Sequence, residues 1–178
     1  SILPMKNLDF LLVILHKVNV PIDFTIYGPK KNSDYLKKCL KLIDTLPKNI
    51  KVSFKGEVHH QKVQRCLSKY YLFVFPTRGE NFGHAIFESL CAGTPVLISN
   101  KTPWRGRANG ALNVLELDEV KWIKAISFWS KLNNYELNKT RKSALKFARS
   151  YINSKITYKK NKDFLNYLLN NNIKNKFS

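Results

Sequence analysis

Two glutamates, Glu80 and Glu88, lie eight positions apart, just after a continuous apolar run. That run, residues 71–75, is typical of a strand buried on both faces of a parallel sheet. Residues 83–91 predict a helix, and residues 76–82 form the loop that leads into it. The two carboxylates therefore lie on either side of a predicted junction between loop and helix.

The start of this predicted helix is suited to binding an anion. The backbone N–H groups of Gly83, His84 and Ala85 precede the first intrahelical hydrogen bonds and point out of the helix end. Gly83 also has no Cβ to block a close approach. Glu80 lies before this anion site. Glu88 lies five residues into the helix, roughly 7 Å along its axis at about 1.5 Å per residue.

Carboxylates accept hydrogen bonds from vicinal hydroxyls but repel phosphates, so Glu80 and Glu88 should flank a bound anion without touching it. A nucleotide sugar presents its groups in the matching order, with hexose hydroxyls first, then diphosphate, then ribose hydroxyls. Taken singly, each glutamate is better explained as a solvated charge, Glu80 in a loop and Glu88 on a helix surface. The strand–loop–helix context favours the ligand-binding interpretation.

The elements that must position these residues alternate along the chain. Periodicity predicts helices over residues 6–17, 33–46, 59–70, 83–91, 119–132, 138–151 and 160–169, and strands over residues 23–27, 50–54, 71–75, 95–98 and 111–117. Asn7 is the expected N-cap of the first helix. This alternation predicts an α/β fold, a Rossmann-like doubly wound parallel sheet with helices on both faces. Such sheets bind ligands at the carboxyl ends of their strands, which is where Glu80 lies.

The motif around the two glutamates resembles the donor-site signature of family-4 retaining glycosyltransferases. The signature consists of Glu80 and Glu88 with Phe82-Gly83 between them and residues 92–96 (Ala-Gly-Thr-Pro-Val) after them. Further segments that resemble the family are residues 4–7 (its opening loop), 26–29 (its second strand and turn), 54–58 (its base-binding loop), 102–105 and 141–151. The resemblance implies a GT-B architecture, with two Rossmann-like domains and an active site between them. This chain matches the C-terminal, donor-binding half.

The resemblance also implies a role for each site residue. Glu80, the catalytic residue, contacts the transferred sugar, and Glu88 contacts the ribose. The residues implied to bind the donor are Lys6, Val58, Arg78, Asn81, Phe82, Gly83, His84, Ala85 and Glu88. The family's opening loop usually reads Arg-x4-Lys, and here Lys6 matches while Ser1 stands at the arginine position. Arg78 or another cation is expected to substitute.

We therefore expect residues 1–152 to form a nucleotide-sugar-binding domain and residues 153–178 a C-terminal helix with a fraying Lys- and Asn-rich tail. The N-terminal acceptor domain of the same enzyme is expected to precede Ser1. The implied reaction is transfer of a hexose from a UDP- or GDP-sugar donor to a glycan or lipid-linked acceptor, in the assembly of a surface polysaccharide or glycoconjugate. No cofactor is implied, and the chain alone should bind nucleotide without transferring sugar.

The charge of the chain admits a different interpretation. Lys and Arg total 31 against 12 Asp and Glu, a net charge of +19. Such an excess suggests nucleic acid or an anionic membrane as a partner. Only six of these residues are arginines. An AT-rich genome would encode many Lys and Asn residues on the surface of any protein, whatever its function. The alternative function is a basic Rossmann-like module that binds RNA or an anionic membrane surface without catalysis.

Several classes of site are disfavoured by what the sequence lacks. It has no D-x-D triplet to clamp a diphosphate through a metal, and His59-His60 is better explained as a helix start than as a metal site. Metal-independent catalysis is therefore expected, and no nucleic-acid-binding motif is present. Three cysteines at irregular spacing argue against a disulfide framework and indicate buried thiols in a reducing compartment. The expected location is cytoplasmic, with peripheral association at the inner face of the cytoplasmic membrane. Trp104-Arg105 either contacts the donor or closes a loop.

Overall fold

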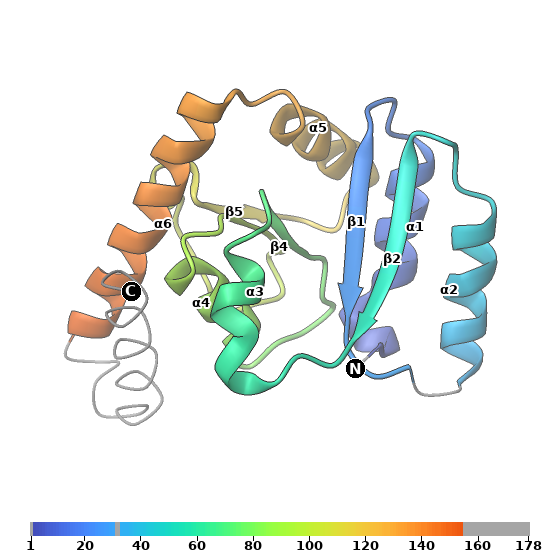
Figure 1. Ribbon diagram of the computed structural model, residues 1–178, viewed down its shortest axis with the longest axis horizontal. Helices are drawn as coiled ribbons and strands as arrows, with labels where there is room; N and C mark the ends of the chain where they lie inside the picture. The colour runs from blue at the N-terminus through green and yellow to red at the C-terminus, as the bar shows by residue number, and fades with distance from the viewer. Residues whose placement is uncertain (1, 31–32, 155–178) are drawn as a thin grey trace.

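The computed structural model describes residues 2–30 and 33–154. Within these ranges helices and strands alternate, as the sequence predicts (Figure 1). The predicted helix over residues 160–169 and the tail lie outside the described residues. The elements in chain order are η1 (Pro4–Lys6), α1 (Leu8–His16), β1 (Ile22–Tyr27), α2 (Asp34–Asp44), β2 (Ile50–Gly56), η2 (His60–Lys62), α3 (Val63–Leu67), β3 (Phe73–Phe75), α4 (His84–Cys91), β4 (Val96–Ser99), η3 (Ala108–Gly110), β5 (Leu112–Leu115), α5 (Glu119–Trp129) and α6 (Asn134–Asn153).

The strands form two parallel sheets. β1 pairs with β2, and β3, β4 and β5 pair in that order. In Figure 1, α1 and α2 lie beside the β1–β2 pair, and α6 lies at the opposite end of the molecule. Parallel strands flanked by helices confirm the predicted α/β class.

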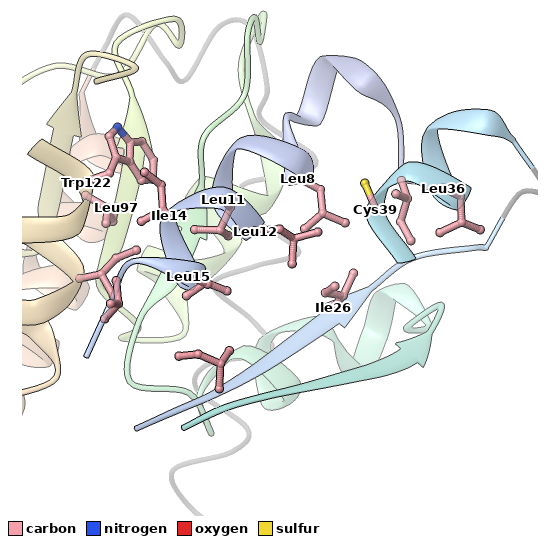
Figure 2. Close-up of a cluster of buried hydrophobic side chains, with 14 residues drawn as sticks. Leu8, Leu11, Leu12, Ile14, Leu15, Ile26, Leu36, Cys39, Leu97 and Trp122 are labelled. Atoms are coloured by element: carbon pink, nitrogen blue, oxygen red, sulfur yellow. The ribbon is translucent and has the colours of Figure 1, made fainter. Parts of the chain in front are cut away.

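Two hydrophobic clusters hold these layers together. The first lies around α1, whose residues Leu12 and Ile14 are fully buried, and it includes Trp122 of α5. Figure 2 shows the α1 side chains between Ile26 of β1 on one side and Leu97 and Trp122 on the other. The second cluster joins α4, β4 and α6. Both clusters include residues of β4, which is buried along its whole length, so this strand anchors the loops at either end of it.

The predicted helices differ from the structure at several ends, and two of the differences are substantial. The helix expected over residues 138–151 begins at Asn134, because Asn133 and Glu136 form a capping box that fixes an earlier start. The helix expected over residues 59–70 is instead a 3₁₀ turn, η2, followed by the single short helix α3.

Asn7 precedes α1 as predicted, but its side chain makes no capping hydrogen bond. Its backbone is left-handed, with φ of 59°, and its Oδ1 instead accepts a hydrogen bond from Arg78 Nε at 2.9 Å. The expected N-cap therefore links α1 to the loop after β3.

Over residues 2–30 and 33–154, no helix is both long enough and apolar enough to cross a lipid bilayer.

Candidate functional site

The loop between β3 and α4 is fixed from two directions. Thr77 Oγ1 donates a hydrogen bond to the Met5 carbonyl at 3.0 Å, and the Arg78 N–H donates to the same carbonyl at 2.8 Å. On the other side, the Glu80 N–H donates to the Lys101 carbonyl at 3.1 Å. Three segments that are far apart in the sequence thus meet at the carboxyl ends of β3 and β4, where ligands bind in this class of fold.

Gly83 forms the turn into α4. Its φ is 80°, and a Cβ at this position would lie 2.6 Å from Ile86 Cδ1, so a side chain here would be both strained and in collision. The N–H groups of Ile86 and Phe87 both donate to the Gly83 carbonyl. The amides of residues 83–85 therefore precede the helical hydrogen bonds, as the sequence predicts.

Trp104 holds this turn in place. Its indole N–H donates to the Phe82 carbonyl, and its ring stacks on Phe87 with 5.8 Å between centroids. The side chain is buried, with Phe82 and Tyr151 also against it. Of the two alternatives left open by the sequence, the structure supports the closing of a loop.

Glu80 pairs with Lys6 across the opening turn. Lys6 Nζ lies 2.6 Å from Glu80 Oε2, and it also lies 5.1 Å from the centroid of the Phe75 ring. Both side chains are partly exposed, at 33% for Lys6 and 21% for Glu80. An ion pair this close to solvent is held weakly, so each partner remains available to an incoming ligand.

Glu88 lies on α4 with only 10% of its side chain exposed. Burial raises the pKa of this carboxyl from 4.5 to about 7. The imidazole Nδ1 of His60 lies 3.6 Å from Oε1 of Glu88. Sequence reasoning set His60 aside, because nothing in its spacing indicates that the turn after β2 lies against α4.

Arg78 is directed toward α1. Its Nε donates to Asn7, and its Nη2 lies 3.9 Å from Asp9 Oδ2. Asp9 also accepts hydrogen bonds at 2.7 Å from Lys38 and from Tyr35. Burial acts to raise the pKa of Asp9, but these hydrogen bonds and charges lower it overall. The structure therefore joins Arg78 to a network on α1, while Lys6 is the cation at Glu80.

The remaining predicted residues lie around the same edge. Val58 is half-buried in the loop between β2 and η2. Asn81 and His84 are exposed at the start of α4, and the His84 ring lies 5.0 Å from that of Phe82. The three cysteines are free thiols; Cys39 and Cys91 are buried as the sequence predicts, whereas Cys66 is partly exposed. Within the described ranges, no group of three His, Cys, Asp or Glu side chains is arranged to hold a metal ion.

Comparison with known families identifies the chain. The family model described as "Glycosyl transferases group 1" matches residues 1–109. The chain belongs to this family. It is also similar to the O-antigen chain mannosyltransferase RfbU of Salmonella typhimurium, at 32% identity over 111 residues, which are 58% of this chain and 31% of the relative. The chain thus matches about a third of that relative's length.

Solved structures show the same fold. S. aureus TarM superposes with a TM-score of 0.71 at 18% identity, over 94% of this chain and 33% of TarM. Anabaena HepE, solved with UDP and glucose, gives 0.69 at 20% identity, over 84% of this chain and 42% of HepE. The catalytic domain of Helicobacter pylori cholesterol-α-glucosyltransferase gives 0.63 at 19% identity, over 83% of this chain and 91% of that domain. These neighbours are GT-B glycosyltransferases, which confirms the predicted fold.

Proposed function

We propose that this chain is the donor-binding domain of a retaining glycosyltransferase that transfers a hexose from a nucleoside-diphosphate sugar. One observation carries the proposal: the Lys6–Glu80 pair, the start of α4 and the buried Glu88 follow one another along the same edge of the fold. A cation and a helix start attract a diphosphate, and the carboxylates on either side accept sugar hydroxyls.

Each group then has a defined task. The amides of residues 82–85 and the Lys6 ammonium group neutralise the diphosphate, including the charge that develops on the leaving nucleotide. Glu80 accepts hydrogen bonds from the transferred sugar, and Glu88 accepts them from the ribose. Val58 lies against the base, and Asn81 and His84 line the outer side of the diphosphate. The Arg78 guanidinium group supplies further positive charge from the α1 side.

The comparisons support the class of donor and product. HepE was solved with UDP-glucose as well as with UDP and glucose, and RfbU is named as an O-antigen mannosyltransferase. By analogy, the donor of this chain is a UDP- or GDP-sugar, and the product belongs to a surface polysaccharide or glycoconjugate. The acceptor is a glycan or lipid-linked glycan.

The larger organisation is part of the same proposal. Residues 1–152 form the donor domain, and an N-terminal acceptor domain of the same enzyme completes the cleft. By itself this chain binds nucleotide but transfers no sugar. The net charge of +19 supports a cytoplasmic protein that associates peripherally with the anionic inner face of the membrane. The same charge favours a second candidate function, a module that binds RNA or anionic membrane without catalysis.

A thermal-shift panel separates the two candidates. Ligands that bind only the folded state stabilise it, by about 2.7 kcal/mol at a hundredfold excess over Kd. We expect UDP or GDP to raise the melting temperature and an unrelated RNA to leave it unchanged. Stabilisation by RNA or anionic vesicles alone, with no nucleoside diphosphate effective, would support the second candidate.

The proposed reaction is metal-independent, because Lys6 and the start of α4 supply the positive charge. We therefore expect UDP affinity in calorimetry to be the same in EDTA as in excess manganese. Loss of binding in EDTA with recovery in manganese would contradict this assignment of charge.

A further inference from the structure

Glu88 and Asp9 are equally buried, yet their surroundings differ. Each carboxylate side chain is 10% exposed. Asp9 accepts hydrogen bonds from Lys38 and Tyr35 at 2.7 Å, which outweigh the effect of burial and lower its pKa. For Glu88, burial is the cause of a pKa raised to about 7. The His60 nitrogen at 3.6 Å lies beyond ordinary hydrogen-bond distance.

We infer that His60 is a positioning residue of the donor site, which keeps the Glu88 carboxylate ionised for the two ribose hydroxyls. The inference rests on the proposed function and adds to it a residue and a pH dependence. His60 acts through Glu88 and is not itself expected to touch the ribose.

The chemistry of the ribose explains why ionisation matters. Two vicinal hydroxyls offer two O–H donors, and an ionised carboxylate accepts both, one on each oxygen. A protonated carboxyl uses one oxygen as a donor and makes weaker, neutral hydrogen bonds. Burial of Glu88 favours the protonated form near neutral pH. A positively charged imidazole nearby favours the ionised form. The His60 side chain is 54% exposed, so solvent screens part of this effect.

The other elements packed against α4 supply no better candidate for the positive charge that favours ionised Glu88. β3 and β4 contain no ionisable side chain. On α3, Arg65 is exposed to solvent, and Arg141 of α6 donates to the carbonyls of Tyr70 and Ser68.

On α4 itself, the thiol of Cys91 has a pKa raised to about 12, by burial first and then by Glu88, so it stays neutral and supplies no charge. His84 lies one turn before Glu88 on the same helix and is a second imidazole on that side. The matched variants must therefore separate His60 from other histidines.

The position of His60 also fits the order of the ligand. η2 follows the loop that holds Val58, which is assigned to the base, and Glu88 is assigned to the ribose. His60 follows Val58 by two residues and its Nδ1 lies 3.6 Å from Glu88 Oε1, so it adjoins the two residues that are assigned to the nucleoside. Its effect should therefore fall on nucleotide affinity and leave sugar recognition unchanged.

The test is calorimetry of UDP, or of GDP if that is the nucleotide bound, between pH 5.5 and 8.5. In His60→Gln we expect about fivefold to tenfold weaker binding than wild type near pH 6.5, with recovery above pH 8, because one pKa unit corresponds to a tenfold change. His59→Gln removes the adjacent imidazole, and its binding curve should superimpose on that of the wild type. Glu88→Gln should remove most of the pH dependence.

A second measurement needs no nucleotide. Carbon-13 NMR of the Glu88 carboxyl in the free protein should show its titration midpoint at higher pH in His60→Gln than in wild type or His59→Gln. An unchanged midpoint, or a loss of affinity that is equal at every pH, would overturn the inference. A shifted midpoint in a protein that binds no nucleoside diphosphate would overturn the proposed function and, with it, the role of His60 in the donor site.

Discussion

Two helices, α1 and α4, begin next to the proposed site. Their backbone starts are alike, but the charges in their first turns differ. Each follows a left-handed residue, Asn7 with φ of 59° and Gly83 with φ of 80°, and neither start has a side-chain cap. The first turn of α1 carries Asp9, whose negative charge suits the positive end of a helix. The first turn of α4 has no acidic residue.

The buried carboxylates follow the same division. Asp9 is satisfied from within the protein, by Lys38 and Tyr35, and it fastens α1 to α2 and to Arg78. Glu88 keeps a raised pKa because burial dominates its surroundings. The charge of Asp9 is thus balanced by hydrogen bonds and cations within the protein, whereas in the proposed donor site the start of α4 and the Glu88 carboxylate are left for the ligand.

The largest effect on stability should come from removing the Asp9 carboxylate. Asp9→Asn leaves Lys38 and Arg78 without their carboxylate, and we expect a loss of about 2 to 3 kcal/mol in the free energy of unfolding at pH 7. Denaturant titration measures it. The lowered pKa means that the stabilising charge is present above the ordinary value of 3.8 and is lost as pH falls through the folded value. Wild type and variant should therefore converge near pH 2, and a difference that persists there would contradict the electrostatic explanation.

Removing the Glu88 carboxylate should change stability in the opposite direction. The pKa of Glu88 rises from 4.5 to about 7 on folding, so the protonated form stabilises the fold below pH 4.5 and this contribution is lost as pH rises through 7. The free energy of unfolding of Glu88→Gln should therefore be about 2 kcal/mol higher than that of the wild type at pH 8, and the two should be equal at pH 4. Denaturant titration at both pH values measures this. A variant that is destabilised at pH 8 would place Glu88 with Asp9 among the structural carboxylates.

The smallest effect on stability should come from giving α4 an acidic first turn like that of α1. Ala85→Asp gives α4 an acidic first turn, which should change stability by no more than about 0.3–1 kcal/mol. It should also weaken UDP binding about tenfold, because the carboxylate repels the diphosphate. Ala85→Asn, of the same size but neutral, is the control in calorimetry. Equal losses in the two variants would mean that shape, not charge, governs this helix end.

The sequence predicted the parts of the site that are local. Glu80, Gly83 and Glu88 lie within one strand–loop–helix unit, so their order along the edge follows from helix geometry alone. The contacts that bring distant segments together were not predictable in this way. Nothing in the spacing of His60 indicates its approach to Glu88, and the pairing of Arg78 with Asn7 depends on where α1 packs.

The errors at helix ends have local causes. The start of α6 was predictable from the capping box of Asn133 and Glu136, a signal that apolar periodicity alone does not contain.

The role of Trp104 could not be decided from the sequence, because a tryptophan beside a binding loop suits a ligand contact and a core position equally well. Its burial against Phe82 and Phe87 decided between them.

The central claim is the order of the ligand along α4, and calorimetry on Glu80→Ala and Glu88→Ala tests it most directly. Each variant is titrated with the nucleoside diphosphate and with its sugar conjugate, UDP-glucose or GDP-mannose, whichever the wild type binds. Glu88→Ala should weaken both ligands ten- to a hundredfold, since a charged hydrogen bond of this kind contributes roughly 1.5–3 kcal/mol. Glu80→Ala should leave the nucleoside diphosphate almost unchanged and weaken only the nucleotide sugar. Equal losses for Glu80→Ala with and without the sugar would contradict the assignment of Glu80 to the hexose and Glu88 to the ribose.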